Sequence, residues 1–159
     1  MPRKVTASLE RSVLPDRRYQ STLVSRLINK SMLNGKKHLA ERAVYAAIEA
    51  AAKKMHSENP VEVLEKAISN VSPAFEVKSR RVGGANYQIP FPISGHRQLH
   101  FAVSWLVTAA RARHGMPYAK RLENEIIDAC NETGAAFKKK EDTHRMAEAN
   151  RAFAHFARS

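Results

Sequence analysis

Two histidines, His96 and His100, stand four residues apart in a segment whose apolar residues recur with helical spacing. That spacing places two imidazoles on one helix face, as in many zinc sites. The zinc-peptidase motif has glutamate directly after its first histidine, whereas this chain has Arg97 there. An adjacent cation also opposes the binding of a metal cation, and the other histidines are scattered among basic or polar neighbours. The sequence therefore predicts no metal site.

Three further groups could serve catalysis, and each has a simpler structural interpretation. The single cysteine, Cys130, lies on an apolar helical stripe, which indicates a buried structural thiol. Gly83-Gly84 lacks the spacing of a phosphate-binding nucleotide loop. The Glu141-Asp142 carboxylates are flanked by lysines and an arginine, so ion pairing along a helix explains them. We therefore expect no catalysis and no cofactor.

The net charge is the most informative bulk property. The 159 residues include 27 Lys and Arg against 15 Asp and Glu, which gives a net charge of +12. An excess of this size usually implies a polyanionic partner. Nucleic acid is the first candidate, and an anionic membrane surface is the second. No apolar run approaches the roughly 20 residues that span a bilayer, so we do not expect a membrane-spanning segment.

The positive charge is also segregated along the chain. Residues 77–121 contain eight bases and no acid, whereas residues 41–76 contain four bases and six acids. Residues 122–132 carry four acids and no base. Charge that served only solubility would be spread evenly, whereas a nucleic-acid footprint needs it concentrated. The acidic third helix is expected to face solvent or a basic protein neighbour.

The basic groups must be positioned by a mostly α fold. Residues 1–18 are basic and poor in apolar residues, which is typical of an extended arm, and residues 19–159 form a single helical domain. Six helices are expected in a bundle-like arrangement. The third begins with Asn59 as its N-cap and Pro60 in its first turn, and Glu62 completes the pattern of a capping box.

Helical spacing also assigns the core faces. Leu39 is placed on the apolar face of the second helix, and Met146 on that of the sixth. The fourth helix is expected from about residue 95 to 113, the fifth from 117, and the sixth from about 135 to 156.

Between the third and fourth helices the apolar period changes to two. Phe75 and Val77, then Tyr87 and Ile89, alternate with other residues as in strands. Gly83-Gly84 between them supplies the positive φ angles of a tight reversal. The sequence therefore predicts a two-stranded β-hairpin at about 74–93 that protrudes from the helical body with a basic tip.

Three stretches together resemble the bacterial-type small-subunit ribosomal protein seven family. They are Asn34-Gly-Lys-Lys37, the hairpin stretch from Val77 to Gly84 followed by Tyr87-Gln-Ile-Pro90, and the run from Lys138 to His155. The resemblance covers about residues 14–156, and the last two stretches are long and correctly spaced. Residues 91–100 depart from the family's pattern.

The resemblance implies a structural constituent of the small ribosomal subunit. Such a protein binds the 3′ major domain of the small-subunit rRNA, nucleates assembly of the head and has no catalytic activity. Its hairpin lies near the exit-site tRNA and the mRNA, and its protein neighbours are other head proteins and a platform protein. The expected location is the ribosome of a bacterial cytoplasm or of an organelle such as a plastid.

The charge map and the resemblance together give the predicted contact residues. The residues predicted to bind rRNA are Arg3, Lys4, Arg11, Lys36, Lys37, Arg97, Arg111, Arg113, Lys138, Lys139, Lys140 and Arg145. The predicted hairpin contacts to rRNA, tRNA or mRNA are Lys78, Arg80, Arg81, Asn86 and Tyr87. Tyr87 could stack on an unpaired base, or it could merely pair across the ribbon.

The alternative function is that of an architectural helical protein that binds DNA or a membrane surface. A ribbon with a Lys-Arg-Arg tip is unlike an amphipathic membrane helix, which argues against the membrane form.

Overall fold

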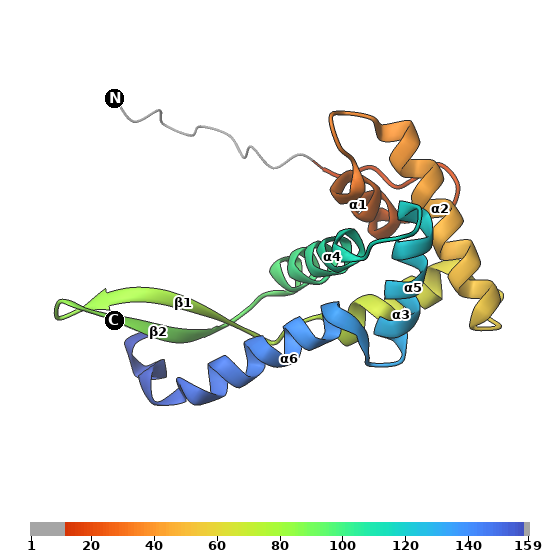
Figure 1. Ribbon diagram of the computed structural model, residues 1–159. Helices are drawn as coiled ribbons and strands as arrows, with labels where there is room; N and C mark the ends of the chain where they lie inside the picture. Colours follow the sequence, from red (N-terminus) through yellow and green to blue (C-terminus); the bar gives the residue numbers. More distant parts are fainter. Residues whose placement is uncertain (1–11, 158–159) are drawn as a thin grey trace, which may run out of the picture.

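The computed structural model describes residues 12–157 and contains six α-helices, a two-stranded sheet and a short 3-10 helix within that range. The elements in order are α1 (Thr22–Ser31), α2 (Lys37–Lys54), α3 (Pro60–Val71), β1 (Phe75–Val82), β2 (Ala85–Pro92), α4 (Gly95–Ala112), α5 (Tyr118–Cys130), α6 (Gly134–Ala149) and η1 (Arg151–Ala157). The predicted fold class is confirmed. Figure 1 shows a helical body from which the hairpin and α6 extend side by side.

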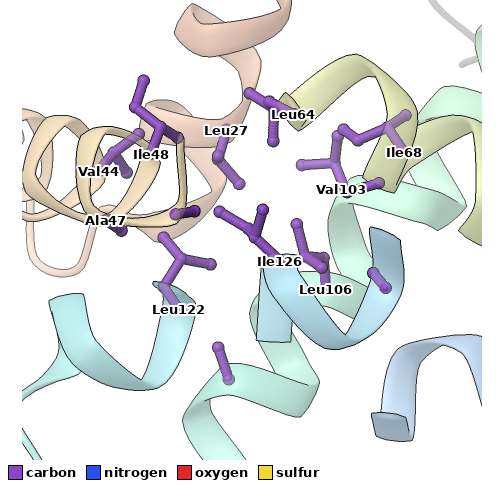
Figure 2. Close-up of a cluster of buried hydrophobic side chains, with 14 of the residues drawn as sticks. Leu27, Val44, Ala47, Ile48, Leu64, Ile68, Val103, Leu106, Leu122 and Ile126 are labelled. Atoms are coloured by element: carbon purple, nitrogen blue, oxygen red, sulfur yellow. The ribbon is translucent and has the colours of Figure 1, made fainter. Parts of the chain in front are cut away.

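One hydrophobic core joins α1 to α5 (Figure 2). Each helix contributes aliphatic side chains that are almost fully buried, including Leu27, Ile48, Leu64, Leu106 and Ile126. The buried face of α2 is rich in alanine, which lets α5 pack closely against it. This core fixes the helix ends from which the basic residues project.

Two predicted core residues are wrong. Leu39 is 61% exposed and Met146 is 47% exposed. On α2 the buried stripe starts one residue later, at Ala40, and continues through Val44 and Ala47. A single residue turns a helix by about 100°, so Leu39 lies outside this stripe.

The start of α3 was predicted correctly, whereas the end of α6 was not. Asn59 caps α3 as expected, because its Oδ1 accepts from the Val61 N–H at 3.1 Å. Glu62 bonds to the side-chain amide of Asn59 instead of to its backbone N–H. The predicted sixth helix is too long: α6 ends at Ala149, and the Asn150 side chain donates to the Met146 carbonyl at 2.8 Å before η1 begins. Asn favours such local bonds over helix continuation.

Asp16 organises the segment that leads into α1. Its carboxylate accepts hydrogen bonds from the backbone N–H groups of Arg18, Tyr19 and Ser21 and from the Tyr45 hydroxyl. Burial alone would raise the pKa of Asp16, but these four donors together hold it below its ordinary value. The last part of the predicted arm therefore folds against α1 and α2.

Asp16→Asn is expected to lower the free energy of unfolding by about 1–3 kcal/mol at neutral pH, because the amide accepts these bonds less well than a carboxylate. The native pKa is depressed, so this stabilisation is complete above the unfolded-state pKa near 3.8 and is lost as the pH falls through the native value. Urea unfolding of both proteins at neutral pH and in acid measures it. The difference should shrink in acid, and an equal difference at both values would contradict the assignment. Glu65→Gln, at an exposed carboxylate of α3, is the control.

The hairpin has a regular antiparallel register, and α6 and η1 pack against it. β1 and β2 pair in antiparallel register from Phe75 opposite Pro92 to Val82 opposite Ala85. Gly83 and Gly84 have φ values of 58° and 90°, as the predicted two-residue reversal requires. A two-stranded ribbon is marginal alone, and here α6 and η1 pack along it. The hairpin therefore protrudes as predicted but is not free-standing.

Candidate nucleic-acid interface

The tip of the hairpin presents polar groups directly beside the turn. Arg81 and Asn86 face each other in the register, and both are exposed. Arg80 is also exposed, and its Nη1 donates to the Phe156 carbonyl at 3.0 Å. That bond holds Arg80 against η1. Arg81 forms no ion pair with a carboxylate of the described residues. A guanidinium in this position can grip phosphate through two hydrogen bonds.

Tyr87 is engaged within the protein. Its ring centroid lies 5.1 Å from that of Phe153 and 5.6 Å from that of Phe156, and the side chain is partly buried. Phe153 and Phe156 of η1 thus pack against the Tyr87 ring. This packing favours a structural role over base stacking, through contact with η1 rather than with the opposite strand.

The base of the hairpin carries a shared ion pair. The Glu76 carboxylate binds Lys78 Nζ at 2.8 Å and Arg97 Nη2 at 2.6 Å. Burial alone would raise the pKa of Glu76, but Arg97 and Lys78 together hold it below its ordinary value. One carboxylate therefore joins β1 to the first turn of α4. Lys78 lies midway along the hairpin, opposite Ile89, and not at its tip.

The start of α2 combines features that favour binding of an anion. Lys36 and Lys37 are exposed, and they follow the turn formed by Asn34 and Gly35. No side chain caps this helix, and its first turn has no acid. The free N–H groups and the helix dipole favour negative charge at this end. The two lysines add mobile positive charge at the same place.

Two predicted arginines of the α4 end have internal partners. Arg111 donates to the Lys30 and Ser31 carbonyls at 3.3 Å, which ties α4 to the end of α1. Arg113 forms ion pairs with Glu125 and Asp128 of α5. The charge of Arg113 is thereby neutralised, whereas that of Arg111 has no carboxylate partner among the described residues. These ion pairs favour a structural role for Arg113 over a contact with RNA.

The basic side chains of α6 divide in the same way. Lys138 and Lys139 are exposed. Lys140 donates to the Asn70 carbonyl at 2.7 Å and lies over the Phe137 ring. Arg145 is 79% exposed on its side chain, with only a 3.7 Å contact to an acid one turn away. Lys138, Lys139 and Arg145 are thus available to a partner.

The remaining predicted contacts, Arg3, Lys4 and Arg11, lie outside the described residues. Two basic residues that were not singled out do belong to the exposed or half-exposed surface, namely Arg42 of α2 and Arg121 of α5. They line one cavity together with Lys36 and Arg111. Neither lies in the three stretches on which the resemblance was based, so only their positive charge pointed to them.

The catalytic candidates gain no support from the geometry. His96 and His100 are exposed, and within residues 12–157 no three His, Cys, Asp or Glu residues gather as metal ligands. Cys130 is buried, donates to the Val63 carbonyl at 3.3 Å, and has its pKa raised by burial. Within the described range, no helix combines the length and apolar character needed to cross a membrane.

The comparisons with known proteins agree over almost the whole chain. The family described as "Ribosomal protein S7p/S5e" matches residues 2–151. "Small ribosomal subunit protein uS7" of Thermomicrobium roseum is 51% identical over 98% of this chain and 99% of its own length. The proteins of the same name are 52% identical in Dictyoglomus thermophilum and 54% identical in a Hydrogenobaculum species, each over 98% of this chain and 99% of its own length. The resemblance predicted from the hairpin and the basic stretches is confirmed, and the chain belongs to the ribosomal protein S7p/S5e family.

Proposed function

We propose that this protein, a structural constituent of the small ribosomal subunit, binds the 3′ major domain of the small-subunit rRNA and nucleates assembly of the head. Membership in a family of ribosomal proteins places it among structural components of the small subunit and not among enzymes. The tip of its hairpin would lie near the exit-site tRNA and the mRNA. The arm of residues 1–18 would add Arg3, Lys4 and Arg11 to the contacts.

One observation carries the proposal. Exposed cations occur in three separate parts of the structure, which are the hairpin tip, the start of α2 and the first half of α6. Within the described chain, Arg81, Lys37 and Lys139 have no ion-pair partner. Unpaired positive charges in three separate parts of the protein fit a folded RNA with several phosphate strands better than one straight duplex.

Exposed acids at the start of α3 form a surface that could contact protein neighbours. Glu58 precedes α3, and Glu62 and Glu65 lie on its exposed face. Other head proteins and the platform protein are proposed as neighbours, and a basic neighbour would find complementary charge here.

Binding to a transcript of the 3′ domain tests the function. We expect tight binding that weakens by orders of magnitude between about 50 and 200 mM salt, because several phosphates are neutralised together. Duplex DNA and anionic vesicles serve as competitors, and an unrelated rRNA domain is the specificity control. Equal binding to duplex DNA or to vesicles would favour the architectural alternative and contradict the proposal.

A further inference from the structure

A cavity of about 780 Å³ opens between the turn after α1, the first half of α2 and the segment that joins α4 to α5. Its apolar wall includes Leu33, Leu39, Pro117 and Tyr118. Leu33 and Leu39 are 62% and 61% exposed, so two large aliphatic side chains stand at its rim without a covering element among the described residues. The volume is that of a small-molecule pocket.

All the charged side chains that line this cavity are positive. Lys36, Arg42, Arg111 and Arg121 line it, and its lining contains no acid among the described residues. None of the four forms an ion pair with a carboxylate of residues 12–157. By contrast, Arg113 and Lys120, two other cations near α5, do form such ion pairs. An occupant should therefore be anionic and carry an apolar face.

Arg121 adds a second, independent feature. Its Nη1 donates to the Arg111 carbonyl at 3.2 Å and the Arg113 carbonyl at 2.7 Å, and its guanidinium lies 5.9 Å from the Tyr118 ring centroid. Its Nε is buried and has no acceptor among the described residues. Leaving a buried donor of a charged group unpaired is unfavourable. Because this Nε is closed to solvent, an occupant of the cavity would meet the positive charge of Arg121, which has no carboxylate partner among the described residues, and not the Nε itself.

The wall beside Arg121 is held in place before any ligand arrives. The Tyr118 hydroxyl donates to Ser31 Oγ at 2.8 Å, and Arg111 is bonded to the carbonyls that end α1. These bonds join the start of α5, the end of α4 and the end of α1 on one side of the cavity. A preformed wall reduces the entropy that a ligand must lose on binding.

We propose that this cavity receives one unpaired nucleotide of the bound RNA. The base lies between Leu33, Leu39 and Tyr118, and the flanking phosphates lie on Lys36 and Arg42. An unpaired nucleotide has the required flat apolar face and the required negative charge, whereas a paired helix could not enter. The inference rests on the proposed function, because it assumes an RNA partner.

Filling the cavity without changing the charge tests the inference. Ala46 lines the cavity and is exposed, so Ala46→Trp should fold normally and block the base. We expect the affinity for the 3′-domain transcript to fall about 5- to 150-fold, the usual contribution of one stacked base. The salt slope should fall by no more than about 2, because only the phosphate contacts of Lys36 and Arg42 can be lost and those outside the cavity are kept. Ser69→Trp adds the same side chain at an exposed position of α3 and should bind as the wild type does.

A second measurement separates this inference from the proposed function. A pentanucleotide of adenosine should shift the NMR signals of the Leu33 and Leu39 methyl groups and of the Tyr118 ring, and its abasic counterpart should not. If the wild type fails to bind the transcript, the proposed function fails, whatever the pentanucleotide does. If the transcript binds but Ala46→Trp has no effect, or if abasic and normal pentanucleotides act alike, the cavity inference is overturned. The inference would also be overturned if neither pentanucleotide shifted these signals while an acidic leucine-rich peptide did. That result would assign the cavity to a protein neighbour.

Discussion

Glu125→Ala is expected to lower the free energy of unfolding by about 3–5 kcal/mol, the usual cost of removing one partner of a buried ion pair. Glu125 is fully buried, although it is an acid in the middle of α5. Its Oε2 accepts from Arg113 Nε at 2.8 Å, and its Oε1 accepts from the Ala136 N–H at 2.9 Å. One carboxylate thus joins the end of α4, the middle of α5 and the start of α6. Alanine would leave the Arg113 guanidinium and the Ala136 N–H with too few acceptors.

Chemical denaturation at neutral pH measures this effect, and three further variants define its origin. Glu125→Gln keeps an acceptor for Ala136 but loses the charge, so it should cost less than alanine. Glu132→Ala removes an exposed acid just beyond α5 and should change the stability by less than about 0.5 kcal/mol. Replacing both partners, Glu125→Leu with Arg113→Met, should restore part of the loss, because no charge is left buried without a partner and only the Ala136 N–H still lacks its acceptor. A cost below about 1 kcal/mol for Glu125→Ala would contradict this account.

The combined change of Lys37, Arg81 and Lys139 to alanine is expected to weaken binding to the 3′-domain transcript by about 10²–10³-fold near 0.1 M salt. Each of these cations is exposed on a different element, and each phosphate contact contributes about 0.7–0.9 to the salt slope. The slope should therefore fall by about 2–3. Filter binding at several salt concentrations gives both quantities.

The matched control removes bases that lie away from the proposed surface. Lys53, near the end of α2, and Lys66, on α3, are exposed and occur where acids predominate. Their replacement by alanine should change the salt slope by much less for each charge removed. An equal loss for each charge in both variants would indicate attraction by the net charge alone.

The parts of the fold that depend on local pattern could be predicted from the sequence. The paired glycines specified the hairpin reversal, and the Asn59-Pro60 pair specified the start of α3. Basic motifs at the hairpin and along α6 were sufficient to identify the family. These features are encoded within a few neighbouring residues, so no tertiary information was needed.

The parts that depend on tertiary approach could not be predicted. Whether an arginine is free or paired is decided by acids far along the chain, as Arg97 with Glu76 and Arg113 with Glu125 show. The engagement of Tyr87 by Phe153 requires that the chain turn at Asn150, where the apolar pattern alone favoured a continuous helix. Charge counts therefore located the basic surface but could not show which of its arginines and lysines are paired with acids and which are free.

The support of the hairpin by η1 has a consequence for the order in which the protein is made. The hairpin ends at Pro92, whereas the η1 aromatic residues that hold Tyr87 come some 60 positions later. At about 5–20 residues per second, a nascent chain spends several seconds with both strands synthesised and their support still missing. During that interval the ribbon has only its own ladder, which is marginal in water. Translation therefore fixes the tip of the hairpin late, after the core helices α1 to α5 have already emerged.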